Sequence, residues 1–304
     1  MGNRVAISAL LSVYIGTDPN DLDRCLASLV GQTRMPDEVV VLYDGPVQDG
    51  IDTVVLHYQS ILKIRHFRFA KNRGLGPALN DGVGICRGKY IARVDTDDVS
   101  LPSRLETQLD FLDNHPHVWV VGGILEENYL WGSGSRIRLR RLPGNEDDLM
   151  RYAKTRNPLN HQTVMMRREK VLSVGNYIGF PWFEDYHLWV RIMVSGGKLS
   201  NINEVLASTS VARGYFVRRG GWEYSKSEIS LANYFRSIGF LTLPEVVMFL
   251  VLRIPLRIMP NRVRTWLYFQ CLRSRSTSCL SFGLSLGIAF GARNRFIFSG
   301  RDTP

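Results

Sequence analysis

The stretch Tyr90-Ile91-Ala92-Arg93-Val94-Asp95-Thr96-Asp97-Asp98 joins an apolar, β-prone run to three carboxylates within four residues. Like charges this close together repel one another, and burying them unpaired is costly. A bound divalent cation would balance the charge. A solvated acidic turn is the alternative, but acids placed directly after a predicted strand favour a metal site. We therefore expect a strand here whose end carries functional chemistry.

The segments before this stretch alternate between predicted strands and predicted helices. Strands are predicted at 5–14, 38–43, 64–69 and 90–94, and the apolar character of the first two predicts that they are buried. Apolar residues at helical spacing follow the turn at Asp18, and a second helix is expected at 78–86. This alternation predicts an α/β fold with a doubly wound, mostly parallel sheet.

Polar side chains stand at or just past the ends of these predicted strands: Tyr14, Asp44, Lys71 with Arg73, and Asp95 to Asp98. The carboxyl ends of parallel strands meet at one edge of a sheet, where such folds bind their ligands. Arg73 belongs to a glycine-containing loop that opens a helix and suits a phosphate, although a plain tight turn explains the loop equally well. The sequence predicts a ligand site at this edge.

The following segments predict further parts of one domain. Helices are expected at 104–112 and 146–154, and β segments at 118–123, 137–141 and 164–166. His161 lies beside a polar run and is a candidate to face the site. A structural histidine bonded to the backbone is an equally good interpretation.

Glu184 and Asp185 are adjacent acids at the start of a predicted aromatic-rich helix. An acid at a helix N-terminus is ordinarily a cap. Trp182, Phe183 and Trp189 flank these two, and an apolar wall raises the pKa of a carboxylate toward that of a useful base. We favour a catalytic base over a cap alone.

Arginines from Arg213 to Arg219 precede the glycine pair Gly220-Gly221. Arginines beside a flexible pair of glycines can close over an anionic leaving group. A solvated basic loop is the alternative.

The chain has 304 residues and a net charge of +10, and residues 236–304 hold ten arginines and two acids. Arg253 and Arg257 are four apart in an apolar segment too short and too interrupted to span a bilayer, so they predict a basic face at a membrane surface. Ordinary core helices are the alternative. Nucleic acid is disfavoured, because aromatic stacking platforms are missing from this region.

These patterns divide the chain into two parts. Residues 1–235 form one predicted domain, and the family resemblance described below implies a nucleotide-sugar half at about 1–123 and an acceptor half at about 124–235 within it. Residues 236–304 form a basic, apolar helical tail that associates with membranes. The four cysteines show no metal-ligand spacing and fit a reducing compartment.

The order and spacing of several motifs resemble family 2 glycosyltransferases of the GT-A fold, a Rossmann-like, mostly parallel sheet flanked by helices. The motifs are Ser12-Val13-Tyr14, Asp44-Gly45, the segment from Asn72 to Asn80, Asp95-Thr96-Asp97-Asp98 and Glu184-Asp185. The likeness covers roughly residues 5–270 and is nearest to bacterial enzymes of capsule, exopolysaccharide and O-antigen synthesis, of the amylovoran type.

The resemblance implies a role for each motif on the donor side. Tyr14 would stack on the nucleotide base, Asp44 would hydrogen-bond it, and Arg73 would lie nearby. Asp95 would hold the ribose or a metal-bound water, and Asp97, with Asp98 as a further candidate, would bind Mn²⁺ or Mg²⁺. The implied donor is a nucleotide sugar, with UDP favoured as the nucleotide.

On the acceptor side the resemblance implies that Asp185 deprotonates an acceptor hydroxyl and that Glu184 positions Asp185 or the acceptor. Arg218 or Arg219 would stabilise the diphosphate. The implied acceptor is a saccharide linked to polyprenyl diphosphate, and the enzyme would sit peripherally on the cytoplasmic face of the inner membrane, held by the anionic membrane surface.

Three departures from the family pattern stand out. Tyr43-Asp44-Gly45-Pro46 replaces a common Asp-Asp-Gly-Ser, residues 276–304 extend beyond the family, and no processive Gln-x-x-Arg-Trp motif occurs, which favours transfer of a single sugar. Two other functions stay open at this point. One is another nucleotide-sugar enzyme on the same fold, and the other is a catalytically silent, membrane-associated module that binds nucleotide sugars.

Overall fold

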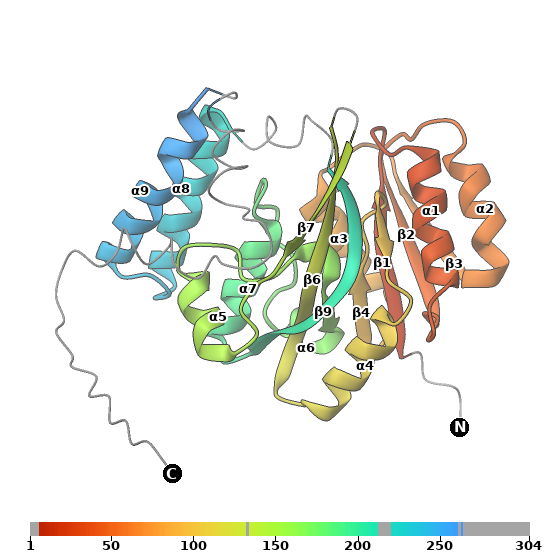
Figure 1. Cartoon of the computed structure of the whole chain (residues 1–304), viewed down its shortest axis with the longest axis horizontal. Coiled ribbons are helices and arrows are strands. Elements are labelled where there is room, and N and C mark those ends of the chain that lie inside the picture. Colours follow the sequence, from red (N-terminus) through yellow and green to blue (C-terminus); the bar gives the residue numbers. More distant parts are fainter. Residues whose placement is uncertain (1–5, 132–133, 212–219, 261–262, 264–304) are drawn as a thin grey trace, which may run out of the picture.

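The structure is a computed structural model that describes residues 6–131, 134–211, 220–260 and 263. One sheet runs through it in the order β3-β2-β1-β4-β8-β6-β9-β5, with β7 paired to β6 (Figure 1). Its strands are β1 (Ile7–Val13), β2 (Glu38–Asp44), β3 (Ile64–Phe69), β4 (Tyr90–Arg93), β5 (Asp98–Ser100), β6 (Val118–Trp131), β7 (Gly134–Arg140), β8 (Met165–Arg167) and β9 (Lys198–Val211).

The N-terminal half of the sheet is parallel, as predicted: β1 pairs in parallel with both β2 and β4, and β2 with β3. Every residue of β2 is buried, because helices cover both faces of the strand. Helices α1 (Pro19–Val30) and α2 (Ile51–Leu62) pack on one face, and α3 (Leu75–Ile85) packs on the other. The parallel arrangement brings the ends of β1, β2 and β4 to one edge.

The other half of the sheet is mixed. β8 pairs antiparallel with both β4 and β6, whereas β6 runs parallel to β9 over most of its length. β5 is a short strand on the outer side of β9 and begins at Asp98. Asp95, Asp97 and Asp98, here called the acid cluster, therefore connect two strands of the sheet, because they lie between the end of β4 and the start of β5.

Helices of the second half complete the domain: α4 (Arg104–Asn114), α5 (Glu146–Ala153), the short 3-10 turn at His161–Thr163, α6 (Arg168–Ser173) and α7 (Glu184–Val194). Helices α8 (Trp222–Ser237) and α9 (Leu243–Ile258) form a hairpin at one side of the molecule (Figure 1). Phe235 and Phe249 of this hairpin belong to the largest core cluster. The hairpin is thus packed on the core of the fold.

The predicted tail begins inside α8, and its first part through α9 is packed as just described. The expected outward basic face of this part is wrong, since Arg253 and Arg257 point inward and both form ion pairs with the fully buried Glu228 of α8. Residues 264–304 lie outside the described residues. Within the described part of the chain, every helix is too short or too polar to cross a membrane.

Candidate active site

Three carboxylates meet in the turn between β4 and β5. The backbone N–H of Asp98 donates to the carbonyl of Asp95 at 3.3 Å, which closes the turn. Asp97 is exposed, Asp95 is partly buried, and Asp98 is only 2 % exposed. The turn therefore presents Asp97 to solvent and holds Asp98 inside the protein.

Mutual repulsion and desolvation act on these acids. The pKa of Asp98 is raised well above its usual range by burial and by the neighbouring charges of Asp95 and Asp97. The pKa of Asp97 is raised as well, because the protein around it removes water and Asp95 repels its charge. Both shifts mean that ionising Asp97 and Asp98 together costs free energy unless a cation compensates their charge.

Two buried arginines lie beneath the cluster, and sequence reasoning assigned a role to neither. Arg93, 1 % exposed, forms an ion pair with Asp95 and donates to the carbonyl of Val94. Arg104, fully buried, donates to the carbonyl of Arg93 at 2.6 Å and to Ser100 Oγ at 2.9 Å. The signal for Arg93 was its position, since a charge inside an otherwise apolar strand needs a buried partner.

The cluster has the chemistry of a site for a hard divalent cation, because all its side-chain donors are carboxylate oxygens. Both oxygens of Asp98 are buried without a well-formed hydrogen bond in the described structure, although Thr209 lies close by. No three metal-ligating side chains converge into a ready-made site among the described residues.

Asp44 connects the end of β2 to the loop before α3. Its Oδ1 accepts from the backbone N–H of Arg73 at 2.9 Å, and its Oδ2 accepts from that of Gly74 at 3.0 Å. The side chain of Asn72 donates to the carbonyl of Asp44 at 3.1 Å. The structure thus brings Asp44 and Arg73 together, and Asp44 orders the loop at the start of α3.

The side chains of Arg73 and Tyr14 are both exposed to solvent near the ends of the parallel strands, although that of Arg73 also contacts neighbouring residues. Arg73 lies over the ring of Phe69 at 3.9 Å and pairs with Asp81 at 2.7 Å. Tyr14 is 43 % exposed, and its ring lies against Gly16, where a Cβ atom would come within 2.6 Å of it. The absence of a side chain at Gly16 therefore allows the Tyr14 ring to take this partly exposed position just past β1.

Glu184 and Asp185 form the first turn of α7, as predicted, but their environments differ. Asp185 accepts from Asn157 Nδ2 at 2.5 Å and from the backbone N–H of Tyr186 at 2.7 Å, which fixes its carboxylate. Burial and the neighbouring Asp185 raise the pKa of Glu184 to about 7. The backbone of α3 lies close to Glu184, because a Cβ at Gly76 would come within 3.2 Å of Glu184 Cβ.

His161 lies near both acidic groups, and its Nε2 is 2.9 Å from the Tyr177 hydroxyl. Burial and the charge of Arg93 lower the pKa of His161 to about 4, whereas Asp185 and Asp95 act in the opposite direction. The ring is therefore neutral at physiological pH. Against the effect of burial, the charge of Arg93 also acts to lower the pKa of Tyr177 and of Glu184, so this buried cation lies within electrostatic reach of both the acid cluster and the pair Glu184–Asp185.

Trp182 precedes the acid pair in an unusual backbone conformation. Its φ is +65°, and its side chain is 50 % exposed beside Tyr224, with the ring centroids 5.4 Å apart. The loop is fastened from α8, because Ser227 Oγ donates to the carbonyl of Pro181 at 3.0 Å. A bulky residue at positive φ is strained and is held only by its surroundings.

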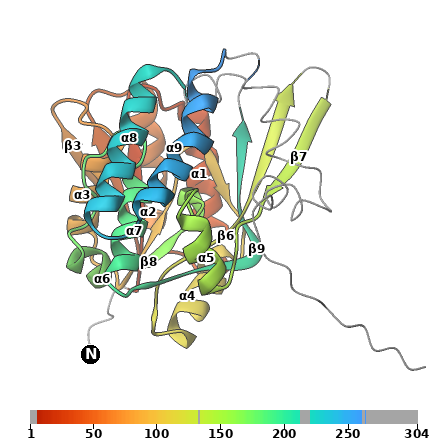
Figure 2. The same cartoon turned by 90° about the vertical axis from the view of Figure 1, so that its left-hand side faces the viewer.

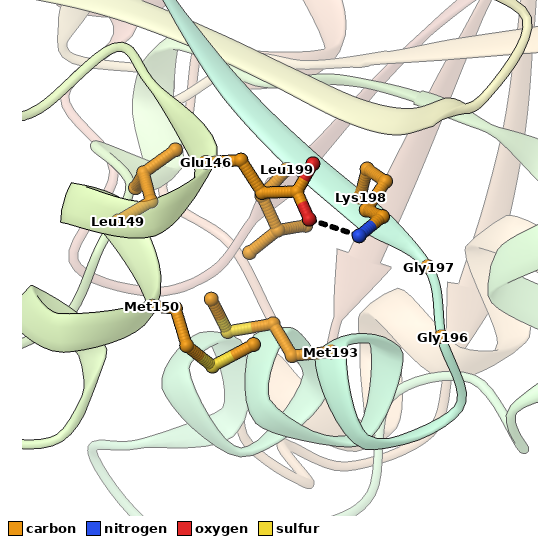
Figure 3. A pocket seen from close by; sticks show the side chains of 8 residues that line it. All are labelled: Glu146, Leu149, Met150, Met193, Gly196, Gly197, Lys198 and Leu199. Atoms are coloured by element: carbon orange, nitrogen blue, oxygen red, sulfur yellow. Dashed lines mark hydrogen bonds and ion pairs between the residues drawn. The ribbon is translucent and has the colours of Figure 1, made fainter.

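Arg218 and Arg219 lie outside the described residues. A small cavity between α5, α7 and β9 is lined by Met150 and Met193, with the Lys198–Glu146 ion pair at one side (Figure 3). Its volume of about 40 Å³ is too small for a nucleotide sugar, and it shares no residue with the acid cluster or the acid pair.

Comparisons with known proteins agree with this geometry. The family described as Glycosyl transferase family 2 matches residues 8–175. The amylovoran biosynthesis glycosyltransferase AmsE of Erwinia amylovora is 36% identical over 264 residues, which cover 86% of this chain and 97% of that protein. The UDP-Gal:alpha-D-GlcNAc-diphosphoundecaprenol beta-1,3-galactosyltransferase of Escherichia coli is 30% identical, over 88% of this chain and 96% of that protein.

A solved structure shares the fold. The mannosyltransferase PcManGT from Pyrobaculum calidifontis, in complex with GDP-Man and Mn²⁺, superposes with a TM-score of 0.60 at 16% identity, over 94% of this chain and 80% of that one. This likeness confirms the predicted GT-A type of fold. On the family match and the two relatives, the chain belongs to glycosyl transferase family 2 and is a glycosyltransferase.

Proposed function

We propose that this glycosyltransferase is metal-dependent and inverting, and that it moves one sugar, a UDP-linked hexose, to a lipid-linked saccharide in the synthesis of a bacterial surface polysaccharide. The observation that carries the proposal is the reach of the buried Arg93. This cation forms an ion pair with Asp95 of the acid cluster, and its charge acts, against the effect of burial, to lower the pKa of Glu184 in the pair Glu184–Asp185. That shared electrostatic influence supports one site that holds both the donor groups and the base.

The donor's nucleoside would bind along the ends of β1, β2 and β4. Tyr14 offers an exposed ring for the base, and Asp44 and Arg73 form the loop beside it. Asp95 would hold the ribose, and its ion pair with Arg93 fixes the carboxylate for that task. An ordered loop and a fixed carboxylate reduce the entropy lost on binding.

Asp97, with Asp95 and Asp98, would hold Mn²⁺ or Mg²⁺. When bound, the ion neutralises the charge that develops on the departing diphosphate. Asp97 is the first candidate because it reaches solvent, whereas Asp98 is buried. PcManGT is described with Mn²⁺, which supports a divalent ion for this site.

Asp185 would take the proton of the acceptor hydroxyl while the oxygen forms a bond to the anomeric carbon. The bond from that carbon to the diphosphate breaks with inversion, which gives a glycoside, a nucleoside diphosphate and a proton on Asp185. Asn157 and the N–H of Tyr186 hold this carboxylate in one orientation. Glu184 would orient the acceptor, and its ionisation near pH 7 would matter for that role.

The acceptor would lie between His161 and Trp182. The neutral His161 ring offers a polar contact, and the exposed Trp182 ring offers a flat apolar face of the kind that sugars pack against. Arg218 and Arg219, from outside the described residues, remain the proposed partners of the diphosphate.

Names of relatives support the finer parts of the proposal. The Escherichia coli relative is named for UDP-Gal and for an acceptor on diphosphoundecaprenol, which favours a UDP sugar and a polyprenyl-linked acceptor here. The Erwinia relative is named for amylovoran biosynthesis, which favours a surface polysaccharide as the product. Such an acceptor would place the enzyme peripherally on the cytoplasmic face of the inner membrane.

The proposed division of the chain keeps residues 1–235 as the catalytic domain, with halves at about 1–123 and 124–235, and 236–304 as the membrane-associating part. The ordered hairpin of α8 and α9 would join the two parts, because it packs on the domain core. An anionic membrane surface is the proposed partner of the arginines that follow it in the sequence.

The base assignment is tested with Asp185→Asn. We expect kcat to fall by roughly 10²–10⁴-fold, because the acceptor hydroxyl keeps its proton, while calorimetry shows unchanged UDP binding. Asn157→Asp is a companion that keeps the size of the partner but repels Asp185, and a smaller loss of kcat is expected. An unchanged kcat for Asp185→Asn would remove Asp185 from the mechanism.

A further inference from the structure

Helix α9 is amphipathic in the reverse sense from a helix on a water-exposed surface. Its two charged central residues face the protein: Arg253 Nε donates to Glu228 Oε1 at 2.8 Å, and Arg257 Nη2 donates to the same oxygen at 3.0 Å. Arg253 also donates to the carbonyl of Thr155 at 3.1 Å. The guanidinium groups of both arginines therefore form their hydrogen bonds inside the molecule.

The outward face of α9 is apolar along the whole helix. Six large side chains on it are about half exposed or more: Leu243 at 54 %, Val247 at 54 %, Met248 at 53 %, Val251 at 62 %, Leu252 at 48 % and Ile258 at 60 %. Pro244 and Pro255 are exposed between them. At about 100° per residue these eight positions fill roughly half of the helix circumference. We call them the α9 apolar face.

The neighbouring helix α8 shows what an ordinary water-facing surface looks like in this protein. Helix α8 lies beside α9 (Figure 2). The exposed residues of α8 after its first turn are all polar: Lys226, Ser230, Asn233, Arg236 and Ser237. An uninterrupted apolar face on α9 is therefore a local property. The largest apolar patch of a typical monomer covers about 300–600 Å² and is often functional, so a continuous apolar face along a whole helix is a candidate interaction site.

We propose that the α9 apolar face lies in the lipid interface of an anionic membrane, with its side chains among the upper acyl chains. The proposal deepens the membrane association proposed above by assigning the surface that performs it. The arginines of α9, which the sequence suggested for this role, instead anchor the helix to the domain. Insertion of an apolar helix face at the bilayer surface is a known way to bind without spanning.

Charge in the following chain favours lipid over a second protein copy. Residues 259–304, which follow this helix in the sequence, hold seven arginines and a single acid, Asp302. Such a segment is attracted to anionic headgroups at the depth where an interfacial helix lies. Trp222, 62 % exposed, stands beside the end of α9, where Gly221 N–H donates to the carbonyl of Arg257 at 3.0 Å. An indole at this position suits the headgroup region.

The test measures binding of the full chain to phosphatidylcholine vesicles with and without phosphatidylglycerol, by co-sedimentation. Val247→Asp combined with Val251→Asp should weaken partitioning at least about tenfold, since two carboxylates would have to enter the interface. Ser230→Asp combined with Asn233→Asp on α8 adds the same charge to a polar face and should change partitioning less than about twofold. Thermal unfolding of each variant checks that the fold is kept.

Three results would overturn the proposal: equal partitioning of the α9 variant and wild type, no vesicle binding by wild type, or a wild-type dimer in light scattering that the α9 variant converts to monomer. Sugar transfer to a water-soluble acceptor separates this question from catalysis. The α9 variant should keep that activity. Wild type without any transferase activity would refute the proposed function and leave the vesicle result to stand independently.

Discussion

At the scale of single residues, the site depends on how buried charges are balanced. Arg93 is enclosed by protein, forms an ion pair with Asp95, and its charge acts to lower the pKa of Tyr177, Glu184 and His161. Removing one partner of a buried ion pair leaves the other charge uncompensated. The arginine therefore acts as a positioning residue for Asp95 and contributes to the charge around Glu184.

Arg93→Met keeps much of the side-chain volume and removes the charge. We expect a loss of about 2–3 kcal/mol in the free energy of unfolding, less than for a fully buried pair because Asp95 reaches solvent. The donor KM should rise more than kcat falls. Urea titration and steady-state kinetics measure the two effects, and Arg93→Lys should restore part of both. A Met variant with wild-type donor KM would contradict the positioning role.

Glu184 predicts a specific pH dependence. Its pKa in the folded protein is about 7, above that of an unfolded glutamate, so the folded state favours the protonated form. Its contribution to stability is present at acidic pH and is lost as the pH rises through about 7. Glu184→Gln should therefore stabilise the protein relative to wild type at pH 8 and should do so much less at pH 4. Urea unfolding at the two values measures this difference.

The same ionisation should appear in catalysis. If ionised Glu184 orients the acceptor, kcat/KM rises with pH up to a plateau above about 7. In Glu184→Gln this limb should disappear and the remaining rate should be low. A Gln variant that keeps both the rate and the limb would assign the limb to another group.

Two substitutions of Trp182 distinguish the effect of its backbone strain on stability from the effect of its ring on acceptor binding. Trp182→Gly should relieve the positive φ, whereas Trp182→Ala should keep part of the strain, so Gly is expected to be the more stable variant by about 1 kcal/mol. Both variants should raise the acceptor KM and leave the donor KM unchanged, because both lose the exposed ring. A normal acceptor KM in both would remove Trp182 from the acceptor site.

At the scale of elements, the contact between the end of β2 and the loop before α3 orders the region proposed to bind the donor. Gly45 has φ of +84°, and a Cβ there would lie 2.5 Å from the backbone N of Asn72. The two segments approach so closely that the carboxylate of Asp44 can accept hydrogen bonds from the backbone N–H groups of both Arg73 and Gly74. A glycine is required at this turn on both counts.

Gly45→Ala should accordingly cost about 2–3 kcal/mol of unfolding free energy, through strain at positive φ and displacement of the loop. It should also raise the donor KM. Gly84→Ala in α3 is the matched control, since a Cβ there meets nothing within 4 Å, and it should stabilise the helix by about 0.5–1 kcal/mol. Denaturant titration compares them; equal stabilities would show that the close contact is not required.

The sequence predicted some elements well and others poorly, for physical reasons. β3 begins and ends at the residues predicted for it, Ile64 and Phe69, although only Ile64 of the strand is buried. Helix α2 was not predicted, because Val54 and Val55 give it a β-prone composition. The orientation of α9 was predicted wrongly. Spacing shows that Arg253 and Arg257 share a face, but only tertiary structure brings in Glu228 to pair with them.

At the scale of the whole molecule, the proposed site combines two parts of the fold. The parallel half of the sheet ends in the acid cluster, and the start of α7 carries Glu184, whose pKa responds to the charge of Arg93. Strand ends were predictable, because apolar runs and the acids after them are local in sequence. The links made by Arg93, Arg104 and Asn157 were not, because each depends on a partner or an environment that only the fold provides.

The most direct test of the central claim is a donor screen with Mn²⁺ that follows release of nucleoside diphosphate with and without a lipid-linked saccharide. Wild type should release UDP from a UDP-hexose only when acceptor is present, and chelation of the metal should stop it. Asp97→Ala should lose this metal-dependent release by about two orders of magnitude or more. Acceptor-dependent release that continues unchanged in Asp97→Ala or after chelation would contradict the account.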